Sequence, residues 1–127
     1  LALLAACDRA APPPSFQAVD ITGADYAKEL GLPDLDGRAR TLAEFRGRAV
    51  VVFFGFTQCP DVCPTTLAEL AAVKQALGPD GARLQTVFVT VDPERDSPEL
   101  LKNYVAAFDP ATVVLRGTPE QTAAMAK

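Results

Sequence analysis

Three apolar runs that alternate with helical patterns predict a layered α/β fold for this chain of 127 residues. Residues 49–56 and 84–91 are near-continuous runs of β-branched and aromatic residues, typical of strands buried on both faces of a parallel or mixed sheet. Residues 112–115 indicate a third strand, and a helical pattern follows each run. This order favours right-handed crossovers with helices covering the sheet. The chain is 49% hydrophobic and 22% charged, which fits one folded domain.

Two short elements are expected before the first core strand. The turn signal Asp36-Gly37, between short segments around Leu32 and Arg40, predicts a small hairpin. Residues 41–45 are expected to form one helical turn. Three aromatic side chains are expected in the core: Phe54, Phe56 and Phe88.

Each expected helix carries its own start signal. The first begins with Pro64 at its first position and Cys63 flanking it, because a proline there loses no intrahelical hydrogen bond. Ser97 caps the second helix, and residues 118–121 have the Thr-x-x-Gln form of a capping box. The first helix ends near Gly78-Pro79. The expected core-facing stripes are Thr66, Leu67, Leu70, Val73, Lys74 and Leu77 in the first helix, and Leu100, Leu101, Tyr104, Val105 and Phe108 in the second.

The corner between the first strand and its helix carries two cysteines, in the sequence Cys59-Pro60-Asp61-Val62-Cys63-Pro64. A following proline disfavours helical backbone for the residue before it, so we expect both cysteines outside a regular helix. The unpaired N–H groups of a helix N-terminus favour negative charge and lower a thiol pKa. Cys63 is the better placed of the two cysteines to gain from this effect.

The spacing of Cys59 and Cys63 leaves two chemistries open. At helical i, i+4 positions their Cβ atoms would lie roughly 5 to 6 Å apart, against roughly 3.5 to 4.5 Å in a disulfide. A loop would allow a disulfide, whereas a metal between the sulfurs tolerates the wider separation, and thiolates suit Cu(I). We therefore expect the two sulfurs to bind one metal ion together, and also to cycle between the dithiol and a reducible disulfide. Two buried, inert cysteines are the alternative.

Acidic residues follow the second core strand. Because ligands gather at the carboxyl ends of strands in such sheets, Asp92 and Asp96 are expected to face the same cleft as the cysteine loop. Asp92 is a candidate to orient the sulfur ligands. The alternative is that both residues only end a strand and precede a helix, and this alternative is stronger for Asp96. Within the cysteine loop, a turn role suits Asp61, while Thr57 and Gln58 are within reach of the site.

Two sequence blocks resemble the Sco/SenC family of copper chaperones. The first runs from Phe53 to Leu67 and contains both cysteines, and the second is Val91-Asp92-Pro93-Glu94-Arg95-Asp96-Ser97-Pro98-Glu99. With residues 117–121, the resemblance covers roughly residues 31–127. It implies a thioredoxin-like fold in which Cys59, Cys63 and a downstream histidine bind copper. It also implies delivery of that copper to the copper-bearing subunit of cytochrome c oxidase, whose dinuclear centre is being assembled.

The chain departs from the family pattern because it contains no histidine. We therefore expect an interior piece of a longer protein, incomplete at its C-terminus, with the third copper ligand in the absent segment. A thioredoxin-like sheet would still need a closing hairpin and a last helix. Apolar sheet surface is accordingly expected to lie uncovered.

The N-terminal residues carry a third cysteine, at position 7. The stretch Leu4-Ala5-Ala6-Cys7 resembles the lipobox of bacterial lipoproteins, which implies lipidation of Cys7 and anchoring on the periplasmic side of the inner membrane. Pro12-Pro13-Pro14 favours an extended tether. Residues 1–15 are thus expected to be a signal remnant and tether, and residues 16–127 a partial Sco domain. The alternative is a transmembrane anchor, or a cleaved signal in which Cys7 has no role. In either case the domain is expected to be exported.

The charge and the cysteine pair limit the partners and the competing functions. A net charge of −4 with no basic patch argues against nucleic acid as a partner. The main alternative function is a thiol-disulfide oxidoreductase that keeps the cysteines of the oxidase reduced. Other copper chaperones or thiol-disulfide reductants are then expected as partners. A peroxidase, in which one cysteine resolves a sulfenic acid on the other, is less consistent with the second block.

Overall fold

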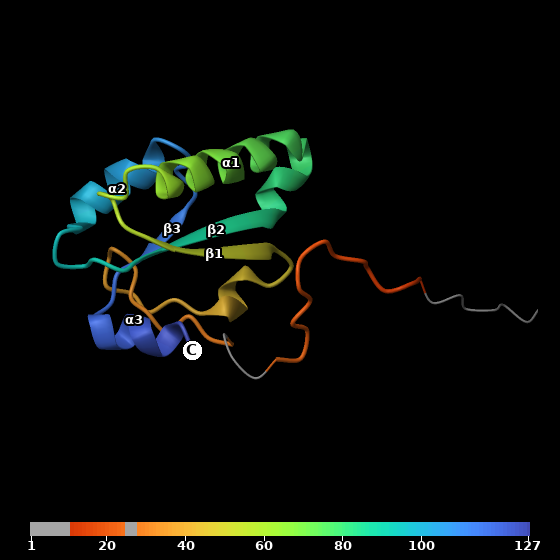
Figure 1. Cartoon of the computed structure of the whole chain (residues 1–127), viewed down its shortest axis with the longest axis horizontal. Coiled ribbons are helices and arrows are strands. Elements are labelled where there is room, and N and C mark those ends of the chain that lie inside the picture. The colour runs from red at the N-terminus through yellow and green to blue at the C-terminus, as the bar shows by residue number, and fades with distance from the viewer. Residues whose placement is uncertain (1–10, 25–27) are drawn as a thin grey trace, which may run out of the picture.

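The computed structural model describes residues 11–24 and 28–127 and has the expected alternation of strands and helices (Figure 1). Its regular elements, in chain order, are the 3-10 helix η1 (Leu42–Phe45), β1 (Ala49–Gly55), α1 (Val62–Ala76), the 3-10 helix η2 (Gly78–Arg83), β2 (Leu84–Thr90), α2 (Pro98–Ala106), β3 (Val113–Leu115) and α3 (Pro119–Met125).

The strands form a parallel sheet in the order β1-β2-β3. Each crossover contains a helix, as parallel pairing requires. The register pairs Gly55 with Thr90 at the carboxyl ends of β1 and β2. The loops that follow these two strands therefore leave the sheet side by side.

Helices cover both faces of the sheet, with α1 and α2 on one face and α3 and η1 on the other (Figure 1). The side chains of β2 alternate between the two cores, as the period of a strand requires. Val87 and Val89 pack with Leu32, Phe45 and Leu115 on the α3 side. On the opposite side, Phe88 packs with a second cluster: Leu67, Leu101, Val105 and Val114.

The strand β1 lies at the edge of the described sheet, so the expectation that both of its faces are buried is wrong. Val52 is 36% exposed and Phe54 is 38% exposed, whereas Phe88 on β2 is completely buried. Phe56 is partly buried. The expected uncovered apolar surface is present as a hollow of about 270 Å³ beside β1, lined mainly by Leu30, Leu42, Val50, Val52, Phe54 and Met125.

The helix α1 begins two residues earlier than the sequence predicts. Asp61 is the capping residue and Val62 the first helical residue, so Cys63 lies inside the first turn and Pro64 is the third helical residue. A proline is tolerated there because the first N–H groups of a helix have no intrahelical acceptor. The apolar stripe of α1 is also narrower than expected, since Val73 and Leu77 are about half exposed.

The remaining start signals are confirmed. Ser97 Oγ accepts the backbone N–H of Leu100 at the start of α2, and Thr118 and Gln121 form a reciprocal capping box at the start of α3. Leu100 itself is 43% exposed and does not join the α2 core face. The hairpin at residues 33–39 is also present, with a positive φ of 80° at Gly37 in its turn.

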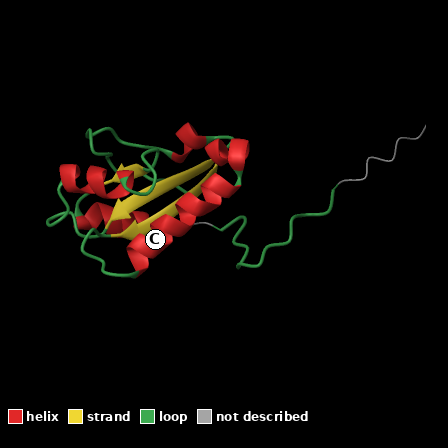
Figure 2. Cartoon of the chain, turned by 90° about the horizontal axis from the view of Figure 1, so that it is seen from above, coloured by secondary structure: helices red, strands yellow, loops and turns green. Residues whose placement is uncertain are grey.

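Residues 11–20 are exposed and extend away from the folded part of the chain (Figure 2). The three prolines of the expected tether lie in this segment, and Cys7 lies outside the described residues. None of the helices within the described ranges has the length and apolar character needed to cross a bilayer.

Candidate metal and redox site

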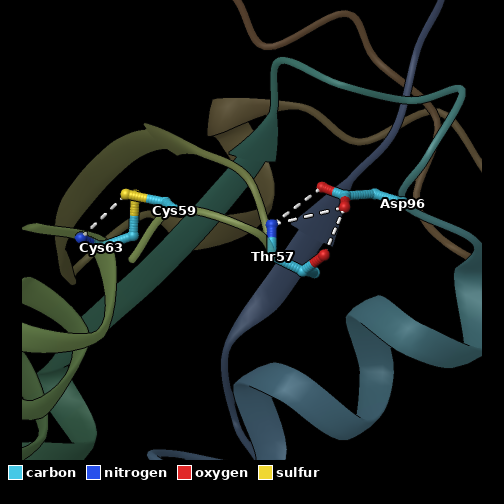
Figure 3. Close-up of a disulfide and its surroundings, with 4 residues drawn as sticks. All are labelled: Thr57, Cys59, Cys63 and Asp96. Atoms are coloured by element: carbon cyan, nitrogen blue, oxygen red, sulfur yellow. Dashed lines mark hydrogen bonds between the residues drawn. A yellow bond between two sulfur atoms is a disulfide. The ribbon is translucent and has the colours of Figure 1, made fainter. Parts of the chain in front are cut away.

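Cys59 and Cys63 form a disulfide at the corner between β1 and α1, with their Cα atoms 5.8 Å apart (Figure 3). The backbone N–H of Cys59 closes a turn onto the carbonyl of Phe56, at 3.3 Å. Cys59 is partly exposed, whereas Cys63 is only 4% exposed and packs inside the first turn of α1. The first cysteine is thus the more accessible to a partner.

The first turn of α1 directs a hydrogen-bond donor at the sulfur of Cys59. The backbone N–H of Cys63 donates to Cys59 Sγ at 3.3 Å, and the side chain of Asp61 does not cap the helix. Positive potential at a helix N-terminus stabilises a thiolate. The sequence favoured Cys63 for the lowered thiol pKa, but this contact favours Cys59.

The loop before Cys59 is tied to the second sequence block by Asp96. This aspartate is completely buried, and its carboxylate accepts the backbone N–H of Thr57 at 3.2 and 3.3 Å (Figure 3). The hydroxyl of Thr57 donates to the same carboxylate at 2.5 Å. Two segments 39 residues apart in sequence are therefore joined two residues before Cys59.

Further contacts fix Asp96 itself. The hydroxyl of Thr90, the last residue of β2, donates to its carboxylate at 2.7 Å. The guanidinium of Arg116 donates to the backbone carbonyls of Asp96 and Pro93, at 2.9 and 2.7 Å. The carboxylate consequently faces the cysteine loop from a firmly held position.

Asp92 does not make the contact with the cysteine loop that its candidate role of orienting the sulfur ligands would require. Its carboxylate forms an ion pair with Arg95, at 2.5 Å, and no described hydrogen bond joins it to the cysteine loop. The residue that contacts this loop is Asp96, for which the sequence favoured a strand-ending role. A signal that could have identified it is its place in the loop after β2, at the same edge of the sheet as the loop that carries Thr57.

The charge of Asp96 also acts on a neighbouring tyrosine. Burial raises the pKa of Tyr104, and the negative charge of Asp96 raises it further, so the phenol stays neutral at physiological pH. The ring of Tyr104 packs between those of Phe88 and Phe108, with centroid distances of 6.0 and 5.6 Å. These rings form part of the core between the sheet and α2.

The cysteine pair offers two soft sulfur donors once its disulfide is reduced. Thiolates are suitable ligands for Cu(I), and both sulfurs lie on one short segment. Within the described ranges, no group of three or more His, Cys, Asp or Glu side chains converges to hold a metal ion. In the described part of the chain, the reduced pair therefore offers two sulfur donors, and no third side chain of these types joins them.

A parallel sheet between helices, with a cysteine pair at the start of its first helix, defines a thioredoxin-like protein with a dithiol site. The family model described as SCO1/SenC matches residues 19–127. The chain belongs to the SCO1/SenC family.

Relatives with known names and structures agree with this assignment. The human mitochondrial protein SCO2 homolog is 47% identical over 97 residues, which are 75% of this chain and 36% of the human protein. The structure of Bradyrhizobium japonicum ScoI with copper bound is 44% identical, with a TM-score of 0.64. That match covers 72% of this chain and 59% of the ScoI chain, so the chain spans only part of the length of its relatives.

Two further solved structures share the fold at lower identity. A SCO1/SenC family lipoprotein of Bacillus anthracis is 27% identical, with a TM-score of 0.61 over 76% of this chain and 64% of its own. The protein BsSco, described as a member of the Sco family of cytochrome c oxidase assembly proteins, is 23% identical. Its TM-score is 0.63 over 80% of this chain and 61% of its own, which shows the shared fold.

Proposed function

We propose that this protein is an exported copper chaperone that delivers copper to the dinuclear centre of cytochrome c oxidase during assembly of the oxidase. The observation that carries the proposal is the pairing of Cys59 and Cys63 at an accessible corner of a Sco-type fold. A relative at 44% identity has copper bound, and BsSco is described as belonging to a family of oxidase assembly proteins.

Copper is the cargo of the proposed reaction, and the two thiolates hold it. The disulfide must first accept two electrons and two protons from a dithiol reductant, which is itself oxidised to a disulfide. Loss of both thiol protons then leaves two soft donors for Cu(I). The family resemblance implies a histidine as a further ligand, and this sequence contains none. Transfer proceeds by exchange of these ligands for those of the copper-bearing oxidase subunit.

The alternative function is a thiol-disulfide oxidoreductase, and the disulfide itself favours it. In the reduced protein, the thiolate of Cys59 attacks a disulfide of the oxidase copper site and forms a mixed disulfide. The thiolate of Cys63 then attacks Cys59 and releases the oxidase cysteines as thiols. The electron pair thus passes from this protein to the oxidase, and an external dithiol reductant regenerates the pair.

The proposed location is the periplasmic side of the bacterial inner membrane. The lipobox-like sequence ending at Cys7 supports a lipid anchor, with residues 1–15 as the remnant and tether and residues 16–127 as the Sco domain. The fold relative from Bacillus anthracis is described as a lipoprotein. Radiolabelled palmitate incorporation into the parent, and its absence from a Cys7→Ser variant, would test this proposal.

A Cu(I) titration of the reduced full-length protein tests the chaperone function. The parent is compared with the double variant Cys59→Ser, Cys63→Ser, both in a Cys7→Ser background so that only the proposed ligands differ. We expect one equivalent of Cu(I) to bind the parent in competition with a chelator and none to bind the double variant. Equal binding by both proteins would contradict copper binding by Cys59 and Cys63, and the thiol-disulfide oxidoreductase would then be the better supported function.

A further inference from the structure

The carboxylate of Asp96 is a buried group that links the loop before Cys59 to the end of β2. It is completely buried and accepts hydrogen bonds from Thr57 N–H, Thr57 Oγ1 and Thr90 Oγ1. Burying a carboxylate costs free energy unless hydrogen-bond donors surround it. Because hydrogen bonds to a charged group are strong, these donors hold the carboxylate in place. Two of its three donors belong to Thr57, in the loop before Cys59, and the third belongs to Thr90 at the end of β2.

The two cysteines are held in unequal ways. Cys63 is fixed because it lies within α1 and is 4% exposed. Cys59 lies in the loop between β1 and α1, which has no regular secondary structure. Its place therefore depends on the residues before it, and the nearest restraint to a distant part of the chain is the bond from Thr57 to Asp96.

We propose that Asp96 is a positioning residue for the cysteine pair: by holding Thr57, it keeps Cys59 Sγ close to Cys63 Sγ and to the N–H of Cys63. The inference rests on the proposed function only in taking this pair as the working centre, whether for copper or for electrons. Free motion of Cys59 would lower the effective concentration of one thiol at the other. Loss of the restraint should then favour the reduced form.

A purely structural role would behave differently. A substitution that destabilises the oxidised and reduced forms equally leaves their equilibrium unchanged, because only a difference between the two forms enters the equilibrium constant. We therefore use the exchange in which the protein disulfide and two glutathione molecules give the protein dithiol and glutathione disulfide. Its equilibrium constant responds to positioning of the two cysteines, but not to a loss of stability that is equal in both forms.

The test measures this equilibrium constant for the full-length protein in a Cys7→Ser background. The variants are Asp96→Asn, Thr57→Val, which removes only the hydroxyl donor, and Thr57→Ser, which retains it. Thr122→Val is the matched control, since Thr122 is buried and donates its hydroxyl to Thr118 O at 3.0 Å in α3, away from the cysteines. Denaturant unfolding of each variant gives its stability separately.

We expect Asp96→Asn and Thr57→Val to shift the equilibrium about tenfold toward the dithiol, the size expected for losing a hydrogen bond to a charged group. Thr57→Ser should restore the parent value, and Thr122→Val should lose stability without any shift. If Thr57→Val keeps the parent equilibrium constant, the inference is overturned even where Asp96→Asn does not fold. The measurement uses no copper, so a failed copper titration does not decide it.

Discussion

The backbone N–H of Cys63 points at the sulfur of Cys59 and donates a hydrogen bond to it across 3.3 Å. This contact places the sulfur of Cys59 at the positive end of α1. The same sulfur is the more exposed of the two. Accessibility and thiolate stabilisation therefore coincide at Cys59, which suits the role of attacking thiol that we propose for it, with Cys63 as the resolving thiol.

The first prediction concerns the order in which the two thiols ionise. In reduced protein, Cys59 should have the lower thiol pKa and should be alkylated by iodoacetamide first as the pH is raised. Single variants Cys59→Ser and Cys63→Ser, in a Cys7→Ser background, report one thiol each. Faster alkylation of Cys63 near neutral pH would contradict the assignment.

The second prediction concerns the contribution of the disulfide to stability. The bridge closes a loop of sequence separation 4. Restricting so short a loop in the unfolded chain should stabilise the oxidised protein by about 2 kcal/mol over the reduced protein. Urea unfolding with and without a reductant measures the difference. The double variant Cys59→Ser, Cys63→Ser is the control, because its midpoint should not respond to the reductant.

The third prediction compares two phenylalanines of neighbouring strands. Phe88→Ala should cost about 3 to 5 kcal/mol, because it empties a completely buried site. Phe54→Ala should cost far less, since that ring is 38% exposed beside the uncovered hollow. Denaturant unfolding of the two variants measures both costs. Equal losses would mean that another part of the protein covers β1 in solution.

The fourth prediction concerns acid stability at the hairpin. Desolvation raises the pKa of Asp34, but hydrogen bonds from Arg38, Arg40 and Asp36 outweigh it, and the pKa is lowered below its usual value of 3.8. The unfolded chain therefore binds this proton more readily than the folded chain. The stabilisation is present above pH 3.8 and is lost as the pH falls through the lowered pKa.

Asp34→Asn should accordingly lower the free energy of unfolding by about 1 kcal/mol at pH 7, and by progressively less as the pH falls below 4. Urea unfolding across this range measures the effect. Asp80→Asn is the control, because its ion pair with Arg83 is mostly exposed and worth little. A constant difference between parent and Asp34→Asn at all pH values would exclude titration of Asp34 as the cause.

Local signals in the sequence were enough to predict the order of the strands and α-helices and most of their ends, but not the 3-10 helix η2. Ser97 and Thr118 cap helices because their hydroxyl groups reach the first unpaired N–H groups, a short-range effect. The exposure of Phe54 could not be predicted, since it depends on which strand lies at the sheet edge. The rule that proline starts a helix also misplaced Cys63, because a proline is tolerated throughout the first turn.

The candidate site was predicted only in part. The proximity of Cys59 and Cys63 follows from their spacing, and the disulfide between them was one of the two chemistries left open. The bond between Thr57 and Asp96 joins residues 39 positions apart, so it depends on the register of two strands and has no local signature. The sequence favoured Asp92 over Asp96 as a site residue, whereas in the structure Asp96 is buried and bonded to Thr57 and Asp92 pairs with Arg95.

The pairing of Gly55 with Thr90 also selects one alignment of β1 against β2. Sliding one strand by a residue moves it roughly 3.3 Å, enough to carry Thr57 out of hydrogen-bonding range of Asp96. Such a slip would also turn the side chains of the strand to the opposite face of the sheet. A sheet paired one residue out of register would leave the buried carboxylate of Asp96 without its two Thr57 donors, so these bonds add to the free-energy difference between the native register and its neighbours.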